Sequence, residues 1–404
     1  MNLLNSHPDS YYVSAGWLID GTGGPILKRP VIRVSGGTII SIRLGRPAES
    51  DKEQIIDFSD YTILPGLVDS HVHLSMSGCE EPKTRQRQRN ASFKEAKAVI
   101  FKNLMDHLNS GVVAVRDGGD YRGHTLRYKL DSQDMDSIPI TCAMAGKAWH
   151  AEGRYGSIIG RPPDKGEDLA RSIIRKNHGA DHVKIVNSGL NSLSCYGKET
   201  EPQFSIDELS AAVRMAEGHG LRTMVHANGR RAVREAIEAG CHSIEHGFFM
   251  GDDNLKRMAD KQITWVPTLF TMKALCKAIG QSGVDIDVVK KNLEHQMGQV
   301  ARAGEYGVTI AVGTDSGSLG VNHGESMSEE IGLFISAGLS IEEIVKCATI
   351  NSGKLVGSHY IGGMLISGMP ATFIVTRGSP EKMTDCLNRP KAVFVQGRAW
   401  GTCI

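Results

Sequence analysis

The segment LPGLVDSHVHL, residues 64–74, is the most informative stretch of the sequence. It is a short apolar run that ends in two histidines at i and i+2, and side chains at that spacing point to the same side of an extended strand. Imidazole is a common metal ligand, so a pair presented together at a strand end indicates a metal site. His71 and His73 are therefore the first candidate ligands.

Further apolar runs follow along the chain, separated by segments with helical periodicity. Residues 92–111 and 205–220 place apolar side chains at i, i+3 and i+4 and end in glycine, as amphipathic helices do. This alternation predicts an α/β fold with parallel strands, specifically a distorted (β/α)8 TIM barrel. A doubly wound open sheet is the alternative, but no G-x-G-x-x-G sequence follows a strand. The eight predicted strands are residues 62–73, 111–117, 138–146, 182–186, 222–228, 242–247, 264–269 and 309–316.

The two ends of the chain have a different pattern. Residues 11–56 and those after 361 contain short β-rich runs that are split by glycine-rich turns, and none of these runs is long enough for a helix. The chain has 404 residues, whereas a barrel takes about 250, so there is room for a second unit. We expect a small β-sandwich domain made from residues 1–60 and 362–404, and a barrel domain at residues 61–361.

Composition excludes several classes of protein. Lys and Arg number 46 against 45 Asp and Glu, for a net charge of +1, so no basic surface for nucleic acid is indicated. Hydrophobic residues make up 40%, which is typical of a globular chain. We find neither a signal peptide nor an apolar stretch of membrane-spanning length, and the eight cysteines form no C-x-x-C pair. We expect free thiols, a cytoplasmic location, and neither nucleic acid nor membrane as a partner.

Four other predicted strands also deliver metal-binding side chains. Lys184 lies inside the apolar run 182–186, where a charged amine is costly, while His226, His246 and Asp315 come at strand ends. Any one of them has a plainer explanation, such as a hydrogen-bonded histidine or a helix cap. Together with the first pair they would meet at the same rim of a barrel, which favours an open catalytic metal site. Glu245, next to His246, is expected on the opposite side of its strand in a structural role.

In these motifs the chain resembles the amidohydrolase superfamily, and within it the prolidase-like members with two zinc ions. The resemblance is carried by LPGLVDSHVHL, ADHVKI, HANG, SIEHG and GTDS, and it extends over nearly the whole chain. It implies that His71 and His73 bind the more buried of two divalent ions, and that His226 and His246 bind the more exposed one. Lys184 would take up carbon dioxide as a carbamate and bridge the ions. Asp315 would complete the buried site and exchange protons with the bridging hydroxide.

The resemblance also implies an activity. Hydroxide shared by two metal ions, most simply Zn²⁺, would cleave an amide or related C–N bond of a small molecule such as a dipeptide, an N-acyl amino acid, a urea or a cyclic amide. A deaminase is an alternative, but deaminases of this superfamily lack the bridging lysine and typically use a glutamate near strand five. Here HANG is followed by Arg230 and Arg231. An inactive metal-binding scaffold is a further alternative.

Substrate contacts are predicted from their position near the same rim. His150 would be a catalytic group, because prolidase-like relatives place a histidine there that can donate to the substrate carbonyl. Relatives often carry a tyrosine just after the strand-five histidine, whereas this chain has Asn228 two positions after His226. Asn228 is a candidate substrate contact, and the departure puts dipeptide specificity in doubt. Arg230 could clamp a carboxylate through two hydrogen bonds. Tyr155 and His323 are the other candidates, and a homo-oligomer is compatible with barrels of this type.

Overall fold

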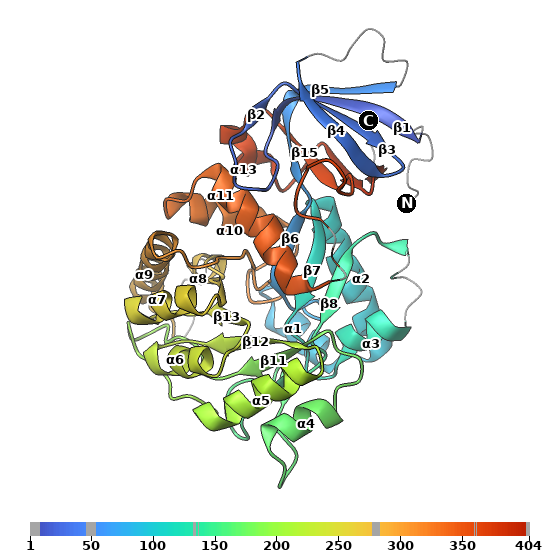
Figure 1. The fold of residues 1–404 in the computed structure, drawn as a ribbon. Helices are drawn as coiled ribbons and strands as arrows, with labels where there is room; N and C mark the ends of the chain where they lie inside the picture. The colour runs from blue at the N-terminus through green and yellow to red at the C-terminus, as the bar shows by residue number, and fades with distance from the viewer. Residues whose placement is uncertain are drawn as a thin grey trace.

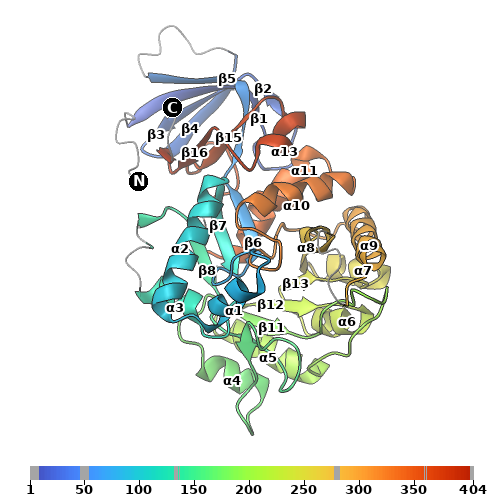
Figure 2. The ribbon, with the colours of Figure 1, turned by 180° about the vertical axis from the view of Figure 1, so that it is seen from behind.

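The computed structural model describes residues 9–45, 54–131, 135, 137–276, 283–358, 360 and 362–400. Figure 1 shows a β-sheet at one end of the molecule, near both termini, and next to it a group of strands surrounded by helices. Figure 2 shows the same arrangement from behind. The predicted α/β class is confirmed.

The end sheet combines strands from both ends of the chain. Its order is β17-β16-β15-β5-β1-β3-β4, with β2 paired to β1. The two ends meet where β15 runs antiparallel to β5, with Phe373 opposite Pro65. The strands form one sheet, so the predicted sandwich of two sheets is not confirmed. The strands are β1 (Ser10–Leu18), β2 (Leu27–Lys28), β3 (Pro30–Ser35), β4 (Thr38–Leu44), β5 (Gln54–Pro65), β15 (Phe373–Arg377), β16 (Ala392–Val395) and β17 (Arg398–Trp400).

This sheet has its own apolar core, separate from that of the helical part. Val13, Ile32 and Phe394 are fully buried in it, and the ring of Phe394 stacks on that of Phe373 with centroids 4.4 Å apart. The predicted domain boundary at residue 60 stays a prediction, and β5 continues through it to Pro65 before the chain enters the helical part.

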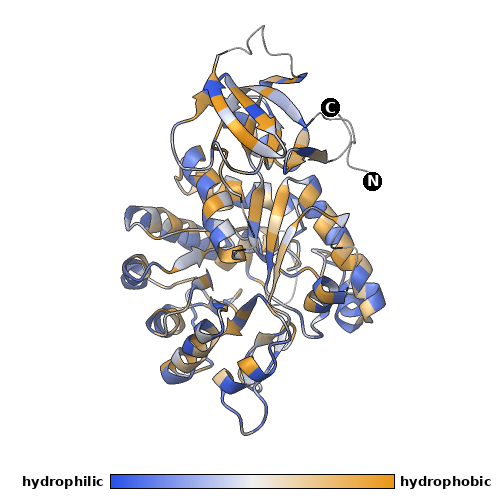
Figure 3. Ribbon diagram, turned by 45° about the vertical axis from the view of Figure 1, so that its right-hand side comes forward, coloured by the Kyte–Doolittle hydropathy of each residue, from blue (hydrophilic) through white to orange (hydrophobic). Residues whose placement is uncertain are grey.

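The remaining strands are parallel and lie in two sheets. One has the order β6-β7-β8 and the other β10-β9-β11-β12-β13-β14. Figure 3 shows these strands as predominantly hydrophobic in the middle of the molecule. They are β6 (Leu67–Val72), β7 (Val112–Asp117), β8 (Thr141–Met144), β9 (Ala148–Trp149), β10 (Gly160–Arg161), β11 (His182–Val186), β12 (Arg222–Ala227), β13 (Ser243–His246) and β14 (Thr264–Val266).

Helices follow most of these strands and cover them from outside. The two helices predicted from periodicity are α2 and α5, and each begins with a capping box, Ser92 with Glu95 and Ser205 with Glu208. The helices are α1 (Pro82–Asn90), α2 (Phe93–Asn109), α3 (His124–Asp131), α4 (Leu169–Arg175), α5 (Ile206–Gly218), α6 (Arg230–Glu238), α7 (Asp252–Asp260), α8 (Phe270–Leu275), α9 (Ile286–Glu305), α10 (Glu325–Ser336), α11 (Ile341–Lys346), α12 (Ser352–Val356) and α13 (Met383–Cys386).

The eighth predicted strand, residues 309–316, is present only as isolated bridges. Ile310 pairs with Trp265 of β14, and Ser316 pairs with Val72 of β6. The extended conformation ends at Asp315, which has a φ of 59°, in the left-handed region. The segment nevertheless connects β14 to β6 through backbone hydrogen bonds, including one of 2.8 Å from Asp315 N to the His71 carbonyl.

The ring of strands is open on the opposite side. In the described part of the chain, β8 and β11 share no ladder, and β11 pairs instead with the short strand β9, Ile185 opposite Trp149. The chain bends out of β8 at Gly146, whose φ is 73°, and this turn brings β9 into the position beside β11. A closed eight-stranded barrel is therefore not observed among these residues, although the strands have the predicted order and direction.

Two features bear on the predicted compartment. The seven cysteines of the described part are all free thiols, as predicted, and Cys403 lies outside the described residues. Among the described helices, none has the length and apolar character needed to span a membrane. The cytoplasmic location stays a prediction.

Candidate metal centre

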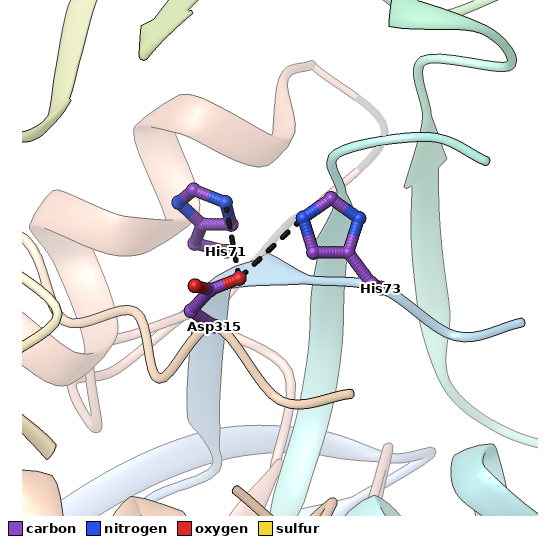
Figure 4. Close-up of side chains that lie close together, drawn as sticks. All are labelled: His71, His73 and Asp315. Atoms are coloured by element: carbon purple, nitrogen blue, oxygen red, sulfur yellow. Dashed lines mark ion pairs between the residues drawn. The ribbon is translucent and has the colours of Figure 1, made fainter. Parts of the chain in front are cut away.

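Three of the predicted ligands form a compact cluster. His71 and His73 come from the end of β6, and Asp315 lies opposite them at the end of the segment 309–316 (Figure 4). Oδ1 of Asp315 is 3.6 Å from Nε2 of His71 and 3.4 Å from Nε2 of His73. One ligand atom from each of the three falls within 4.8 Å of the others, which is close enough for a shared cation.

Lys184 is the fourth predicted ligand and lies at the centre of β11. Its side chain is 1% exposed, and Nζ is 3.4 Å from Nε2 of His71. Burial lowers the pKa of Lys184 to about 8, although the negative charges of Glu245 and Asp315 oppose this shift. At a pKa of about 8, roughly a tenth of the amine is neutral at pH 7, far more than for an ordinary exposed lysine.

His226 and His246 complete the group from the ends of β12 and β13. Their ring centroids are 4.5 Å apart, and that of His246 is 5.0 Å from the ring of His71. Burial lowers the pKa of His226 to about 3 and holds the pKa values of His71 and His246 well below 6.5. These imidazoles are therefore neutral at physiological pH, which is the form that binds metal ions.

The second nitrogen of each imidazole is held by a group on the protein side. Nδ1 of His73 is 2.9 Å from the Gly119 carbonyl oxygen, and Nδ1 of His246 is 2.7 Å from Oγ1 of Thr268. Nε2 of His226 is 3.1 Å from the Gly189 carbonyl oxygen. Such contacts orient metal-binding histidines and fix their tautomers. The donor set and its supports therefore fit a divalent metal centre.

Glu245 holds the remaining histidine, which corrects our prediction. It was expected to point away from His246, yet its Oε2 is 2.9 Å from Nδ1 of His71, and both residues lie beside that imidazole. Glu245 lies on the same side of β13 as Ser243, whose Oγ donates a hydrogen bond of 2.5 Å to Oε1 of Glu245, and the left-handed φ of 66° at His246 brings the His246 ring to this side as well. Sequence reasoning also missed Arg116, which is fully buried and binds Oε1 of Glu245 at 2.8 Å. The presence of a charged residue in the otherwise apolar predicted strand 111–117 could have identified Arg116 as a buried functional residue.

A cavity of about 300 Å³ opens above this cluster and is lined by all six predicted ligands. Of the predicted substrate contacts, Tyr155 and Asn228 also line it. The ring of Tyr155 lies against that of His226, with centroids 5.5 Å apart. The Asn228 side chain is largely committed to the backbone, because its Oδ1 accepts a hydrogen bond of 3.0 Å from Phe248 N.

The other three predicted substrate contacts do not line this cavity. Arg230 starts α6 and lines a separate cavity on the outside, because the side chain leaves the rim at the helix start. His323 is buried and pairs with His107 at 3.0 Å, while its Nε2 is 2.8 Å from the Met76 carbonyl oxygen. His150 is also buried, with Nδ1 2.8 Å from the Ala151 carbonyl oxygen and no hydrogen-bond partner for Nε2 among the described residues.

Two arginines that line the cavity were not predicted. Arg85 and Arg89 lie on α1, which follows β6. Their sequence context, PKTRQRQRN, is that of an exposed polar helix, so composition gave no reason to separate them from surface residues.

Neutral imidazoles, a carboxylate and a buried lysine that line one cavity fit the class of proteins that hydrolyse bonds with divalent metal ions. Comparison with known proteins makes this specific. The family model of the amidohydrolase family matches residues 62–399, and the chain belongs to that family. The family implies divalent metal ions as cofactors and makes the protein a hydrolase of carbon–nitrogen bonds.

Similar proteins include several enzymes of different specificity. Ochratoxinase of Aspergillus niger is 25% identical over 94% of this chain and 84% of its own length. Imidazolonepropionase of Fusobacterium nucleatum is 24% identical over 87% of this chain and 83% of its own. A crystal structure of a Xaa-Pro dipeptidase with methionine in the active site superposes with a TM-score of 0.79 at 26% identity, covering 97% of this chain and all of that one.

Proposed function

We propose that this protein hydrolyses an amide or related C–N bond of a small molecule, such as a dipeptide, an N-acyl amino acid, a urea or a cyclic amide, with two zinc ions. One observation carries the proposal: six potential ligands from five separate parts of the chain line the same cavity. Chance placement of single histidines does not produce this convergence. The Xaa-Pro dipeptidase and ochratoxinase likenesses support the same reaction class.

The residues would divide the two ions between them. His71 and His73, with Asp315, would hold the more buried ion, and His226 and His246 the other. Lys184 would add carbon dioxide through its neutral amine and bridge the two as a carbamate, for which its lowered pKa and burial are the requirement. When bound, two divalent ions lower the pKa of a shared water and polarise the substrate carbonyl.

Asp315 would transfer the proton. Its Oδ2 accepts a hydrogen bond of 3.0 Å from Oγ of Ser318, which fixes the carboxylate and leaves Oδ1 facing the imidazoles. Burial raises the pKa of Asp315, which moves its proton affinity toward that of a useful general base. It would accept the proton of the attacking water and deliver it to the leaving nitrogen.

One contact distinguishes the proposal from the deaminase alternative. A lysine that is merely structural in such a site needs a carboxylate partner, because an isolated buried ammonium is costly. No ion pair of Lys184 occurs in the part of the chain that the structure describes, and its amine instead lies 3.4 Å from Nε2 of His71. An amine in this position favours modification and a bridging role.

The proposal is tested by a substrate screen on the zinc-loaded protein. We expect hydrolysis of at least one compound from a panel of N-acyl amino acids, dipeptides, cyclic imides and aryl ureas. Removing the metal with a chelator should lower the rate by about 10² or more, and adding zinc with bicarbonate should restore it, because the ions supply several kcal/mol of transition-state stabilisation. Activity that is indifferent to the chelator would contradict the proposal, as would release of ammonia from heterocyclic amines alone.

A further inference from the structure

The cavity contains a basic group that the proposed chemistry does not use. Arg85 and Arg89 are four residues apart on α1, and both line the cavity together with Lys184 and Asp315. Residues at i and i+4 lie on the same face of a helix. Helix α1 therefore presents one basic face to the site.

The two arginines differ in what they bind. Arg85 is an anchor, because its Nη1 donates to the carbonyl oxygens of Ser77 and Cys79 at 3.0 and 3.3 Å, and its Nη2 donates to that of Gly317 at 3.1 Å. These bonds tie α1 to the loop after β6 and to the loop that follows Asp315. Burial lowers the pKa of Arg85, as does the neighbouring charge of Arg89.

Arg89 makes no such bonds. Among the described residues, its guanidinium has neither an ion pair nor a hydrogen bond, and the side chain is exposed at the cavity. Asp315 is the one acidic side chain among the described residues that line the cavity, and Arg85 and Arg89 are the two arginines there. The Asp315 carboxylate already contacts His71 and His73. A negative charge that pairs with the Arg89 guanidinium therefore has to be supplied by the ligand.

The rest of the lining is strongly apolar. Ile158 and Leu190 belong to it although they are 46% and 58% exposed, and Phe248, Met272 and Leu275 extend the same surface. Single exposed apolar residues are ordinary on a protein surface. Two of them at one cavity that also holds buried apolar side chains indicate an apolar ligand group.

We propose that Arg89 binds a carboxylate of the substrate, and that the substrates are amides with both a free carboxylate and a bulky apolar group. N-acyl amino acids and dipeptides with large apolar side chains are the simplest members of this class. A guanidinium matches a carboxylate because it offers two parallel N–H donors. The inference rests on the proposed function, since it names the substrates of the same site.

The test compares acids with their neutral amides. The probes are N-benzoyl-L-phenylalanine and Met-Phe, each paired with its primary amide, and release of benzoate or methionine measures cleavage of the internal bond. The proteins are the wild type, Arg89→Ala, Arg89→Lys and Arg87→Ala. Arg87 lies on the same helix, is exposed and does not line the cavity, so its variant is the matched control.

We expect the zinc-loaded wild type and Arg87→Ala to prefer each acid to its amide by about tenfold or more in kcat/KM, as a charge-assisted hydrogen bond provides. In Arg89→Ala the ratio of kcat/KM for the acid to that for the amide should fall to about one, chiefly because KM for the acid rises. Arg89→Lys should keep part of the acid preference, because the lysine ammonium keeps the positive charge but lacks the two parallel N–H donors of the guanidinium. An acid preference that survives in Arg89→Ala, or that is absent from the wild type, overturns the inference.

A binding measurement separates this inference from the reaction itself. Calorimetry of the same acids and amides with each protein after treatment with the chelator reports carboxylate recognition without turnover. If the zinc-loaded wild type cleaves nothing in the wider substrate panel, the proposed reaction fails. The carboxylate inference then stands only if the acids bind more tightly than the amides to the wild type and lose that advantage in Arg89→Ala, and it falls if they do not.

Discussion

Lys184→Ala protein is expected to lose most of its bound zinc and its hydrolytic activity, and to regain part of both when propionate is added. The side chain is 1% exposed and its amine lies 3.4 Å from His71, so truncation removes the group that would bridge the two ions. A small carboxylate can enter the space and offer the two oxygens that a carbamate would supply. The loss should exceed the roughly 10–100-fold effect of changing a residue behind a metal ligand. Metal content and turnover, each with and without propionate, are the measurements.

The control for this variant is Lys291→Ala, because Lys291 is an exposed lysine on α9, away from the cavity. It should retain wild-type metal content and rate. A Lys184→Met protein fills the buried space with an apolar side chain of similar length. It shows whether the loss of activity comes from the missing amine or from unfolding. Full activity in either unrescued Lys184 variant would rule out the bridging role.

Asp315→Asn protein should keep at least one metal ion and lose turnover by about 10²–10⁴-fold, the usual contribution of a positioned acid or base. Asparagine preserves the shape of the side chain and the acceptor that faces Ser318, but it cannot take up a proton. The effect should therefore fall on kcat far more than on KM. Steady-state kinetics and metal analysis of the same preparation check both parts.

Asp253→Asn is the matched control, since Asp253 is exposed in the first turn of α7 and far from the proposed proton transfer. It should behave as the wild type. Wild-type rates in Asp315→Asn protein would remove Asp315 from the mechanism, and complete loss of metal would show that its part is ligation alone.

The convergence of the six ligand candidates could be predicted because it depends on simple rules. Parallel strands end at the same rim, and alternation puts His71 and His73 on one side of β6. A lysine within an apolar run has to be buried, which marked Lys184. None of these inferences requires the strands to close into a barrel. They therefore hold even though β8 and β11 share no ladder in the described part of the chain.

The departures from prediction come from local backbone conformation that no periodicity encodes. His246 and Asp315 have left-handed φ values, which end the regular alternation of side chains at these two residues, so Glu245 and His246 both lie beside His71. Their cause lies in tertiary packing, which alternation rules do not see.

Substrate contacts were the least predictable part of the site, because they depend on the backbone conformation of loops and of the first helical residues, which sets the direction of each side chain. His323 and Arg230 are close to the rim in sequence, yet one pairs with His107 in the interior and the other faces outward. Arg89 is remote from every motif and reaches the cavity because Arg85 anchors their helix to the Gly317 carbonyl. Sequence spacing cannot report such a tertiary contact.

Metal analysis of the purified protein after loading with zinc and bicarbonate tests the central claim most directly. We expect about two zinc ions per chain in the wild type. A His71→Ala, His226→Ala double variant, which removes one ligand from each proposed pair, should hold far fewer. A wild-type protein that binds no zinc under these conditions, or a double variant that binds as much as the wild type, would contradict it.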